Sequence, residues 1–200
     1  IYDISHRTTF SYTSSVAVSQ HFLHLAPRAC PNQATIHHSV IVHPAPTLRM
    51  ENTDYFGNST TYLTLESPHN RLTIASTARV DKRANPMPAP ETTVAWDQVT
   101  HAVAAQTDEA SLYAYQFVFD SPFTLSRDAG DYAAASFAPG RPVLDAAIDL
   151  MHRIHRDFTY EAGATEIETP IDDVLRERRG VCQDFAHLQI ACLRAMGLPV

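Results

Sequence analysis

A proline-rich segment divides this chain into two parts that follow different sequence patterns. The segment reads Asn85-Pro86-Met87-Pro88-Ala89-Pro90, and its prolines remove backbone N–H donors and bias the chain toward extended conformations. Before it, short runs of β-branched and aromatic residues alternate with turn residues, whereas apolar residues after it recur at helical spacing. We therefore expect an α+β protein with a β-rich domain at 1–84, a linker and connecting helix region at 85–140, and the helical N-terminal part of an incomplete second domain at 141–200.

The β-rich part contains several short runs separated by turn residues. Ile36, His38, Val40 and Val42 fall on one face at period two, so one face of their strand packs and the other meets solvent. Gly and Asn within 54–58 indicate a turn, and the Ser-Pro-His-Asn run at 67–70 is another break. Strands at this spacing predict an antiparallel β-sandwich or a partly closed, barrel-like sheet. The predicted strands are 8–12, 16–25, 35–42, 60–65 and 72–80.

The part after the prolines contains four predicted helices. Pro142 suits the first position of one helix, and Thr169 suits the N-cap of another, with Pro170 at its first position. Gly180 permits a turn before the last helix, and Gly197 ends that helix. Apolar residues cover most of the circumference of this last helix, which is typical of a helix buried on nearly all sides. The predicted helices are 94–105, 142–157, 170–177 and 182–196, with an aromatic-rich irregular stretch at 113–123.

Composition excludes several classes of function. A hydrophobic content of 44% is enough for a buried core, and a formal charge of −7 argues against a nucleic-acid partner, since phosphate binding needs clustered Lys and Arg. No apolar run is long enough to span a membrane, so no membrane partner is expected. Three cysteines without paired spacing indicate free thiols and a reducing, cytoplasmic compartment. The chain starts with Ile1 rather than Met, which leaves a removed signal peptide open as an alternative.

Cys182 is the candidate catalytic residue because it stands where the last helix begins. Unpaired N–H groups of a first helical turn and the positive end of the helix dipole favour thiolate over thiol, and the thiolate is the nucleophile of cysteine chemistry. Arg178 and Arg179 lie nearby in sequence and favour the same form. The competing interpretation is that Cys182 is a small buried apolar residue. Cys192 lies within the apolar run of the helix and is expected in the core, and Cys30 has no chemical context.

No histidine of the chain is a convincing base or metal ligand. His187 lies five positions after Cys182, and this spacing rotates the two side chains roughly 140° apart on a helix, so we reject it as the base. His152 and His155 share a helix face, and the adjacent His37 and His38 share a strand, but neither set has a third ligand at a recognisable spacing. We therefore expect no cofactor and no metal.

Several segments together resemble the bacterial transglutaminase-like family. Its members have a β-rich N-terminal region followed by a transglutaminase-like, papain-like cysteine-protease core. The resemblance covers almost the whole chain. The most specific segments are Phe158-Thr159-Tyr160, Gly163-Ala164-Thr165, Thr169-Pro170, Val174-Leu175, Arg178-Arg179-Gly180-Val181-Cys182-Gln183-Asp184-Phe185-Ala186-His187-Leu188 and Arg194-Ala195-Met196-Gly197-Leu198-Pro199.

The resemblance implies a function and a nucleophile. Cys182 matches the family's catalytic cysteine, which attacks an amide carbonyl, forms a thioester and passes the acyl group to water or an amine. The family's histidine and aspartate lie on strands after this helix, so we expect them beyond Val200 and expect the 200-residue chain to have little or no turnover. The implied partner is a protein or peptide amide substrate, acted on by a peptidase, an amidase or a cross-linking enzyme.

Two further expectations follow. One alternative is a non-catalytic scaffold that binds a protein or peptide and keeps a vestigial cysteine-protease fold. In addition, the face of the cysteine helix that would pack on the later strands is expected to be uncovered. We therefore expect either a self-associated oligomer that buries that face or a parent chain whose remainder is disordered or cleaved.

Overall fold

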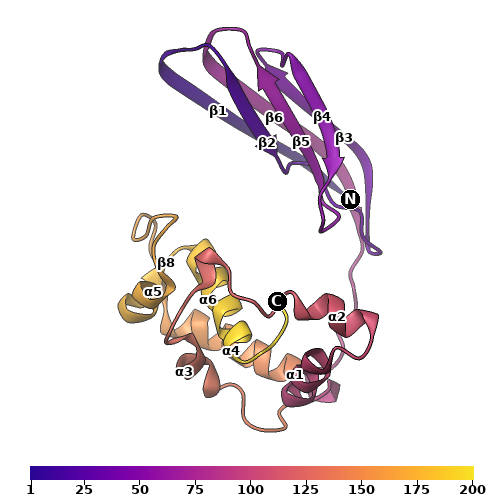
Figure 1. Ribbon diagram of the computed structural model, residues 1–200, viewed down its shortest axis with the longest axis vertical. Coiled ribbons are helices and arrows are strands. Elements are labelled where there is room, and N and C mark those ends of the chain that lie inside the picture. The colour runs from indigo at the N-terminus through magenta and orange to yellow at the C-terminus, as the bar shows by residue number, and fades with distance from the viewer. The chain divides into compact units, whose positions relative to one another are not determined.

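The computed structural model describes residues 1–200, which divide into two compact units, Ile1–Pro86 and Met87–Val200. The first unit consists of antiparallel strands and the second mainly of helices (Figure 1), and each has its own hydrophobic core. The predicted α+β class is therefore confirmed. Residues 87–140 belong to the same compact unit as 141–200. No helix in either unit combines the length and apolar character needed to cross a bilayer.

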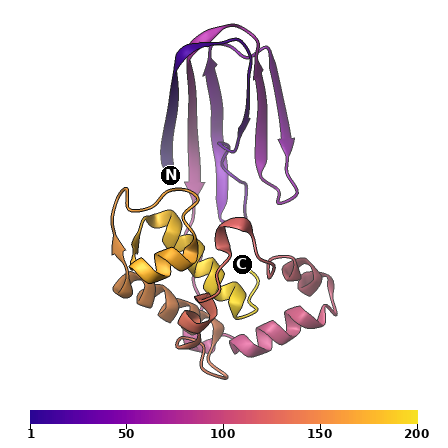
Figure 2. The same cartoon turned by 60° about the vertical axis from the view of Figure 1, so that its left-hand side comes forward.

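Two three-stranded antiparallel sheets form the first unit, and Figure 2 shows them as two layers. In the first sheet, β6 lies between β1 and β3; in the second, β5 lies between β2 and β4. The strands are β1 (Tyr2–Val16), β2 (Ser19–Leu23), β3 (Gln33–His43), β4 (Leu48–Thr53), β5 (Ser59–Leu65) and β6 (His69–Lys82).

The core of the first unit lies between the two sheets. Leu63 and Leu65 of β5 are fully buried and belong to one cluster with Leu72 and Ile74 of β6 and Val40 of β3. These residues recur at period two along their strands, which places them on the inward face of each sheet. Burying a side chain of this size stabilises the fold by about 1.5–3 kcal/mol.

The strand pattern departs from the prediction in three places, the first being β1, which spans Tyr2–Val16 rather than 8–12. The prediction missed β4, whose side chains are all exposed, because a polar strand at a sheet edge carries no alternation of buried and exposed residues. Ile36 was expected on the face of His38 and Val40, but the register shifts between Thr35 and His37, and Ile36 is 57% exposed. A bulge of this kind adds one residue to one strand, so the period of two is broken at that point.

The predicted turn at 54–58 is confirmed and joins β4 to β5. Asp54 Oδ1 accepts hydrogen bonds from the backbone N–H of Phe56 at 2.9 Å and of Asn58 at 2.8 Å, while Gly57 adopts a φ of 79°. The side chain and backbone of Asn58 hold the pKa of Asp54 below its ordinary value. Asp54 thus stabilises the turn by accepting backbone N–H groups, and Gly57 supplies the positive φ that the turn requires.

The second unit is built from short helices around the last helix, α6. Figure 2 shows α6, in yellow, beside α3, α4 and α5, and α6 contacts all three. Two short strands, β7 (Thr159–Tyr160) and β8 (Arg179–Gly180), pair in parallel. The helices are η1 (Pro90–Thr92), α1 (Trp96–Ala105), α2 (Glu109–Tyr115), η2 (Pro122–Thr124), α3 (Ala129–Ala134), α4 (Val143–Asp157), α5 (Ile171–Glu177) and α6 (Cys182–Ala195).

All four predicted helices are present; the last begins at Cys182 as predicted, whereas the other three begin one or two residues later than predicted. Pro142 and Pro170 are the N-caps of α4 and α5 rather than their first residues. Thr169 does not cap α5; its hydroxyl accepts the backbone N–H of Glu166 at 2.9 Å. The stretch at 113–123 that was expected to be irregular overlaps the end of α2, which begins at Glu109 because Asp108 accepts the Ser111 N–H at 2.7 Å in a capping box.

Candidate functional site

Cys182 is the first residue of α6 and is exposed. The strand β8 leads directly into it and is held by parallel pairing with β7. The Thr159 N–H donates to the carbonyl of Arg178, and the Glu161 N–H donates to the carbonyl of Gly180, both at 2.9 Å. Two backbone bonds therefore fix the path of the chain just before the thiol. A group in the first turn of a helix lies beside N–H groups that have no acceptor within the helix.

A buried carboxylate organises this helix start. Asp184 is 3% exposed, and its Oδ2 accepts the backbone N–H of Val181 at 2.7 Å and the hydroxyl of Thr165 at 2.6 Å. Val181 is the N-cap of α6, and its side chain has no acceptor of its own, so the third residue of the helix satisfies the cap N–H instead. The same oxygen ties the loop that contains Thr165 to the helix that begins with Cys182.

Gly180 is required for space rather than for a turn. It lies in β8 and is absent from the glycines with positive φ, so the expectation that it permits a turn is wrong. A Cβ at this position would lie 2.7 Å from Oδ2 of Asp184. The close approach of the Asp184 carboxylate to the backbone therefore excludes a side chain here.

The two arginines expected to favour the thiolate are engaged elsewhere. The Arg178 guanidinium lies over the rings of Tyr132 and Phe158, at 5.1 and 4.8 Å from their centroids. Arg179 pairs with Glu177 at 3.2 Å and with Glu161 at 3.5 Å. Both guanidinium groups thus have partners other than Cys182.

The remainder of α6 is anchored in the core of the second unit. Leu188, Ala191 and Cys192 are buried, and burial raises the pKa of Cys192 to about 12. Cys192 therefore stays a thiol and has no role as a nucleophile. The expectation that α6 is buried on nearly all sides is wrong for its first turns, where Cys182, Gln183 and Ala186 are exposed.

The end of α6 follows the predicted glycine stop. Gly197 has a φ of 78°, its N–H donates to the Arg194 carbonyl at 2.8 Å, and the Leu198 N–H donates to the Leu193 carbonyl at 3.0 Å. This pair of bonds is a Schellman motif, which satisfies carbonyls that the helix leaves free.

The histidines considered from the sequence make contacts other than with Cys182. The His187 ring stacks on Phe123, with a centroid separation of 5.7 Å and an interplanar angle of 18°. His152 and His155 are exposed on α4, whereas Nε2 of His38 lies 3.2 Å from Oγ of Ser76 in the first unit. No group of three or more His, Cys, Asp or Glu side chains is arranged to hold a metal ion.

Asp184 and Thr165 both lie in segments that carry the family resemblance, but the sequence assigned neither of them a role. The available signal was the position of an acid three residues after the N-cap, which is the acidic half of a capping box. Nothing in the local pattern could identify Thr165, because it is 19 residues away in sequence and meets Asp184 only after folding.

Two family models match this chain. Residues 2–81 match the bacterial transglutaminase-like N-terminal region, and residues 131–200 match the transglutaminase-like superfamily. The second match contains β7, β8, α5 and all of α6, and therefore includes Cys182 and Asp184.

Relatives of the chain occur in mycobacteria. The uncharacterized protein Rv2569c of Mycobacterium tuberculosis is 39% identical over 198 residues, with 98% of this chain and 62% of that protein covered. The uncharacterized protein ML0607 of Mycobacterium leprae is 29% identical, with 98% of this chain and 67% of that protein covered. The chain thus spans 62% of the length of the more similar relative.

A solved structure has the same fold. The crystal structure of a proposed cysteine protease from Cytophaga hutchinsonii superimposes with a TM-score of 0.75 at 23% identity, covering 98% of this chain and 64% of that one. At this identity the similarity shows the fold, and the chemistry has to be argued from residues.

Proposed function

The chain belongs to the bacterial transglutaminase-like family, and we propose that it is the N-terminal portion of a cysteine enzyme that acts on amide bonds. The observation that carries this proposal is the position of Cys182, exposed at the first residue of a helix that the core holds in place. Cys30 and Cys192 lack such a setting, since Cys30 lies in a loop and Cys192 is buried.

The proposed reaction is acyl transfer through a thioester. The Cys182 thiolate attacks the carbonyl carbon of an amide, the carbon–nitrogen bond breaks, and the amine leaves with a proton. Water or a second amine then attacks the thioester, which releases an acid or a new amide and restores the thiolate. The backbone N–H of Cys182 is suited to stabilise the oxyanion, because first-turn amides have no acceptor in the helix.

We propose different roles for the neighbouring residues. Asp184 and Thr165 position the helix start and the adjoining loop, while Gly180 leaves room for the Asp184 carboxylate. The base and the group that orients it are proposed to come from a histidine and an aspartate on strands following α6, as in the family that the chain resembles. This proposal predicts that residues 1–200 alone have little turnover, because triad members act as a unit.

The proposal is tested with two substrates and three proteins. Hydrolysis of fluorescently labelled casein and incorporation of a dansylated primary amine into casein are measured for a form extended past Val200, for that form with Cys182→Ala, and for that form with Cys30→Ala. We expect turnover in the extended form and in Cys30→Ala and none in Cys182→Ala. If Cys182→Ala keeps full turnover, Cys182 is not the nucleophile.

The same assay separates the enzyme from a scaffold. Absence of turnover with either substrate in the extended form, together with retained binding of unlabelled casein, favours the non-catalytic interpretation. Turnover by residues 1–200 alone that Cys182→Ala abolishes would instead contradict the assignment of the base to later strands.

A further inference from the structure

The space between the two sheets of the first unit changes from apolar to polar along its length. Side chains paired across antiparallel strands lie on the same face, and Glu51 pairs with Thr61 while Thr53 pairs with Ser59. Residues 59, 61, 63 and 65 of β5 alternate onto one face, which is the face of the buried Leu63 and Leu65. The inward face of β4 and β5 therefore continues from leucines into hydroxyl and carboxylate side chains.

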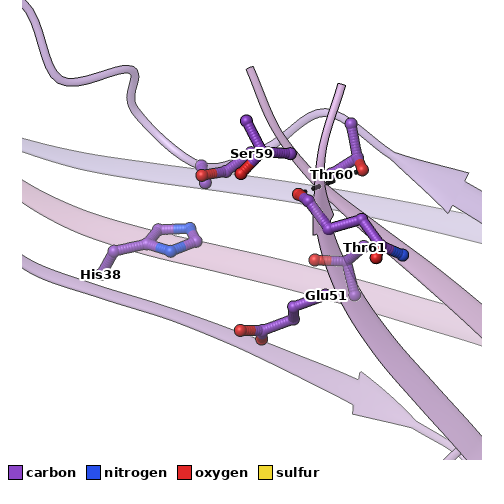
Figure 3. Close-up of a pocket in the computed structure, with 8 residues that line it drawn as sticks. His38, Glu51, Ser59, Thr60 and Thr61 are labelled. Carbon is purple, nitrogen blue, oxygen red and sulfur yellow. Dashed lines mark hydrogen bonds between the residues drawn. The ribbon is translucent and has the colours of Figure 1, made fainter. Parts of the chain in front are cut away.

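The facing sheet changes in the same way. His38 lies two residues before the buried Val40 on β3, so the imidazole is on the inward face. Figure 3 shows His38 and Glu51 directed into the same open space, with Ser59 and Thr61 on its far side. These side chains line a cavity of about 510 Å³. Inward faces of packed sheets are ordinarily apolar, and small-molecule sites occupy roughly 300–1,000 Å³.

Hydrogen bonds assign a role to the histidine. Ser76 Oγ donates to the carbonyl of Leu25 at 3.4 Å, and His38 Nε2 lies 3.2 Å from the same Oγ. With the serine hydrogen used on Leu25, the serine oxygen is available to accept an Nε2–H of His38, and in the tautomer that carries this hydrogen Nδ1 is an acceptor. The imidazole is thereby held in one orientation.

Charge and edge geometry restrict what the cavity can hold. Glu51 is paired with Arg49 at 2.7 Å, so the carboxylate is balanced by a cation, and Arg49 Nη1 donates to the Val40 carbonyl at 2.9 Å. That bond occupies an edge carbonyl of β3, and inward-pointing charges oppose the addition of another strand. The occupant is therefore a small neutral molecule rather than an ammonium compound or an extended peptide.

We propose that this cavity binds a neutral polyhydroxylated ligand of the size of one or two sugar rings. The hydroxyls of Ser59 and Thr61 both donate and accept, whereas His38 and Glu51 contribute acceptors. A ligand rich in hydroxyl groups matches this mixture, because each of its groups can also donate and accept. The site lies in the first unit and is independent of the chemistry proposed for Cys182.

The test is a titration of the isotopically labelled full chain with maltose and with N,N′-diacetylchitobiose, followed by amide chemical shifts. We expect saturable shifts at residues 51–53 and 59–61 with at least one disaccharide. Thr61→Val is expected to weaken binding about tenfold, the effect of one good hydrogen bond. Thr77→Val is the matched control, since Thr77 pairs with Ser39 at 2.9 Å in an exposed hydrogen bond outside the cavity, and it should leave the affinity unchanged.

Three outcomes would overturn the proposal. The first is that these amide signals do not shift at any concentration up to the solubility limit of both disaccharides. The second is that Thr61→Val and Thr77→Val weaken disaccharide binding equally. The third is that putrescine binds saturably and the disaccharides do not. Should Thr61→Val not fold, Ser59→Ala replaces it, with the same expected loss.

Discussion

Removal of the Asp184 carboxylate should destabilise the second unit by about 3 kcal/mol. Asp184→Ala leaves the Val181 N–H and the Thr165 hydroxyl without the oxygen that accepts both, at 2.7 and 2.6 Å. A hydrogen bond to a charged group contributes roughly 1.5–3 kcal/mol, and an N-cap interaction typically about 1 kcal/mol. Because the two bonds share one oxygen, their contributions are not fully additive, and the lower end of the summed range applies.

The assay is urea denaturation followed by the fluorescence of Trp96. This is the only tryptophan of the chain, and it packs edge-on against Phe137 in the second unit, so it reports the unfolding of that unit alone. With a denaturant slope of about 2 kcal/mol/M, a loss of about 3 kcal/mol lowers the midpoint by roughly 1.5 M. Asp184→Asn keeps an acceptor oxygen and should lose about 1 kcal/mol.

Asp173→Ala is the matched control. Asp173 lies in the first turn of α5 and pairs with Arg176 at 2.7 Å on the surface, where an ion pair contributes less than about 1 kcal/mol. A midpoint for Asp184→Ala that equals the midpoint for Asp173→Ala would refute the role given to the buried carboxylate.

Three further predictions concern single residues of the second unit. Burial and the hydrogen bond to Asp157 raise the pKa of Tyr132 to about 12, so the stability that this shift contributes is complete below about pH 10 and is lost as the pH rises toward 12. Ultraviolet titration curves of wild type and Tyr132→Phe should therefore differ by one late-titrating tyrosine. Identical curves would contradict this. Alkylation of the folded chain with iodoacetamide should label Cys30 and Cys182 but not Cys192, because burial raises the pKa of the Cys192 thiol to about 12. Labelled Cys192 detected by mass spectrometry in the folded chain would be inconsistent with its burial. Gly180→Ala should lower the free energy of unfolding by about 1–3 kcal/mol, because the added Cβ would lie 2.7 Å from Asp184 Oδ2. An unfolding midpoint, followed by Trp96 fluorescence, equal to that of wild type would show that the backbone and the carboxylate can move apart.

The sequence predicts elements well where the signal is local. The proline segment, the turn at Asp54, the four predicted helices and the glycine stop at Gly197 all depend on residues within a few positions of one another. Prediction from the sequence pattern is wrong where tertiary contacts determine the structure. β4 is a polar edge strand, and Ile36 does not lie on its expected face because of a bulge that has no signal in the sequence.

The candidate site shows the same division. A cysteine at a helix start can be predicted from sequence, but the directions of Arg178 and Arg179 cannot. Arg178 has a φ of 57°, and its guanidinium reaches rings contributed by α3 and by the end of α4. Proximity in sequence therefore suggested an electrostatic partner for Cys182 that the fold directs elsewhere.

The most direct test of the central claim is the rate at which Cys182 forms a thioester. The chain is incubated with p-nitrophenyl acetate, and acetylation of the peptides containing Cys182 and Cys30 is followed by mass spectrometry. Both thiols are exposed, but only Cys182 stands at a helix start, so each serves as the reference for the other. We predict acetylation at Cys182 about tenfold faster than at Cys30. Equal rates, or faster reaction at Cys30, would contradict the assignment of Cys182 as an activated nucleophile.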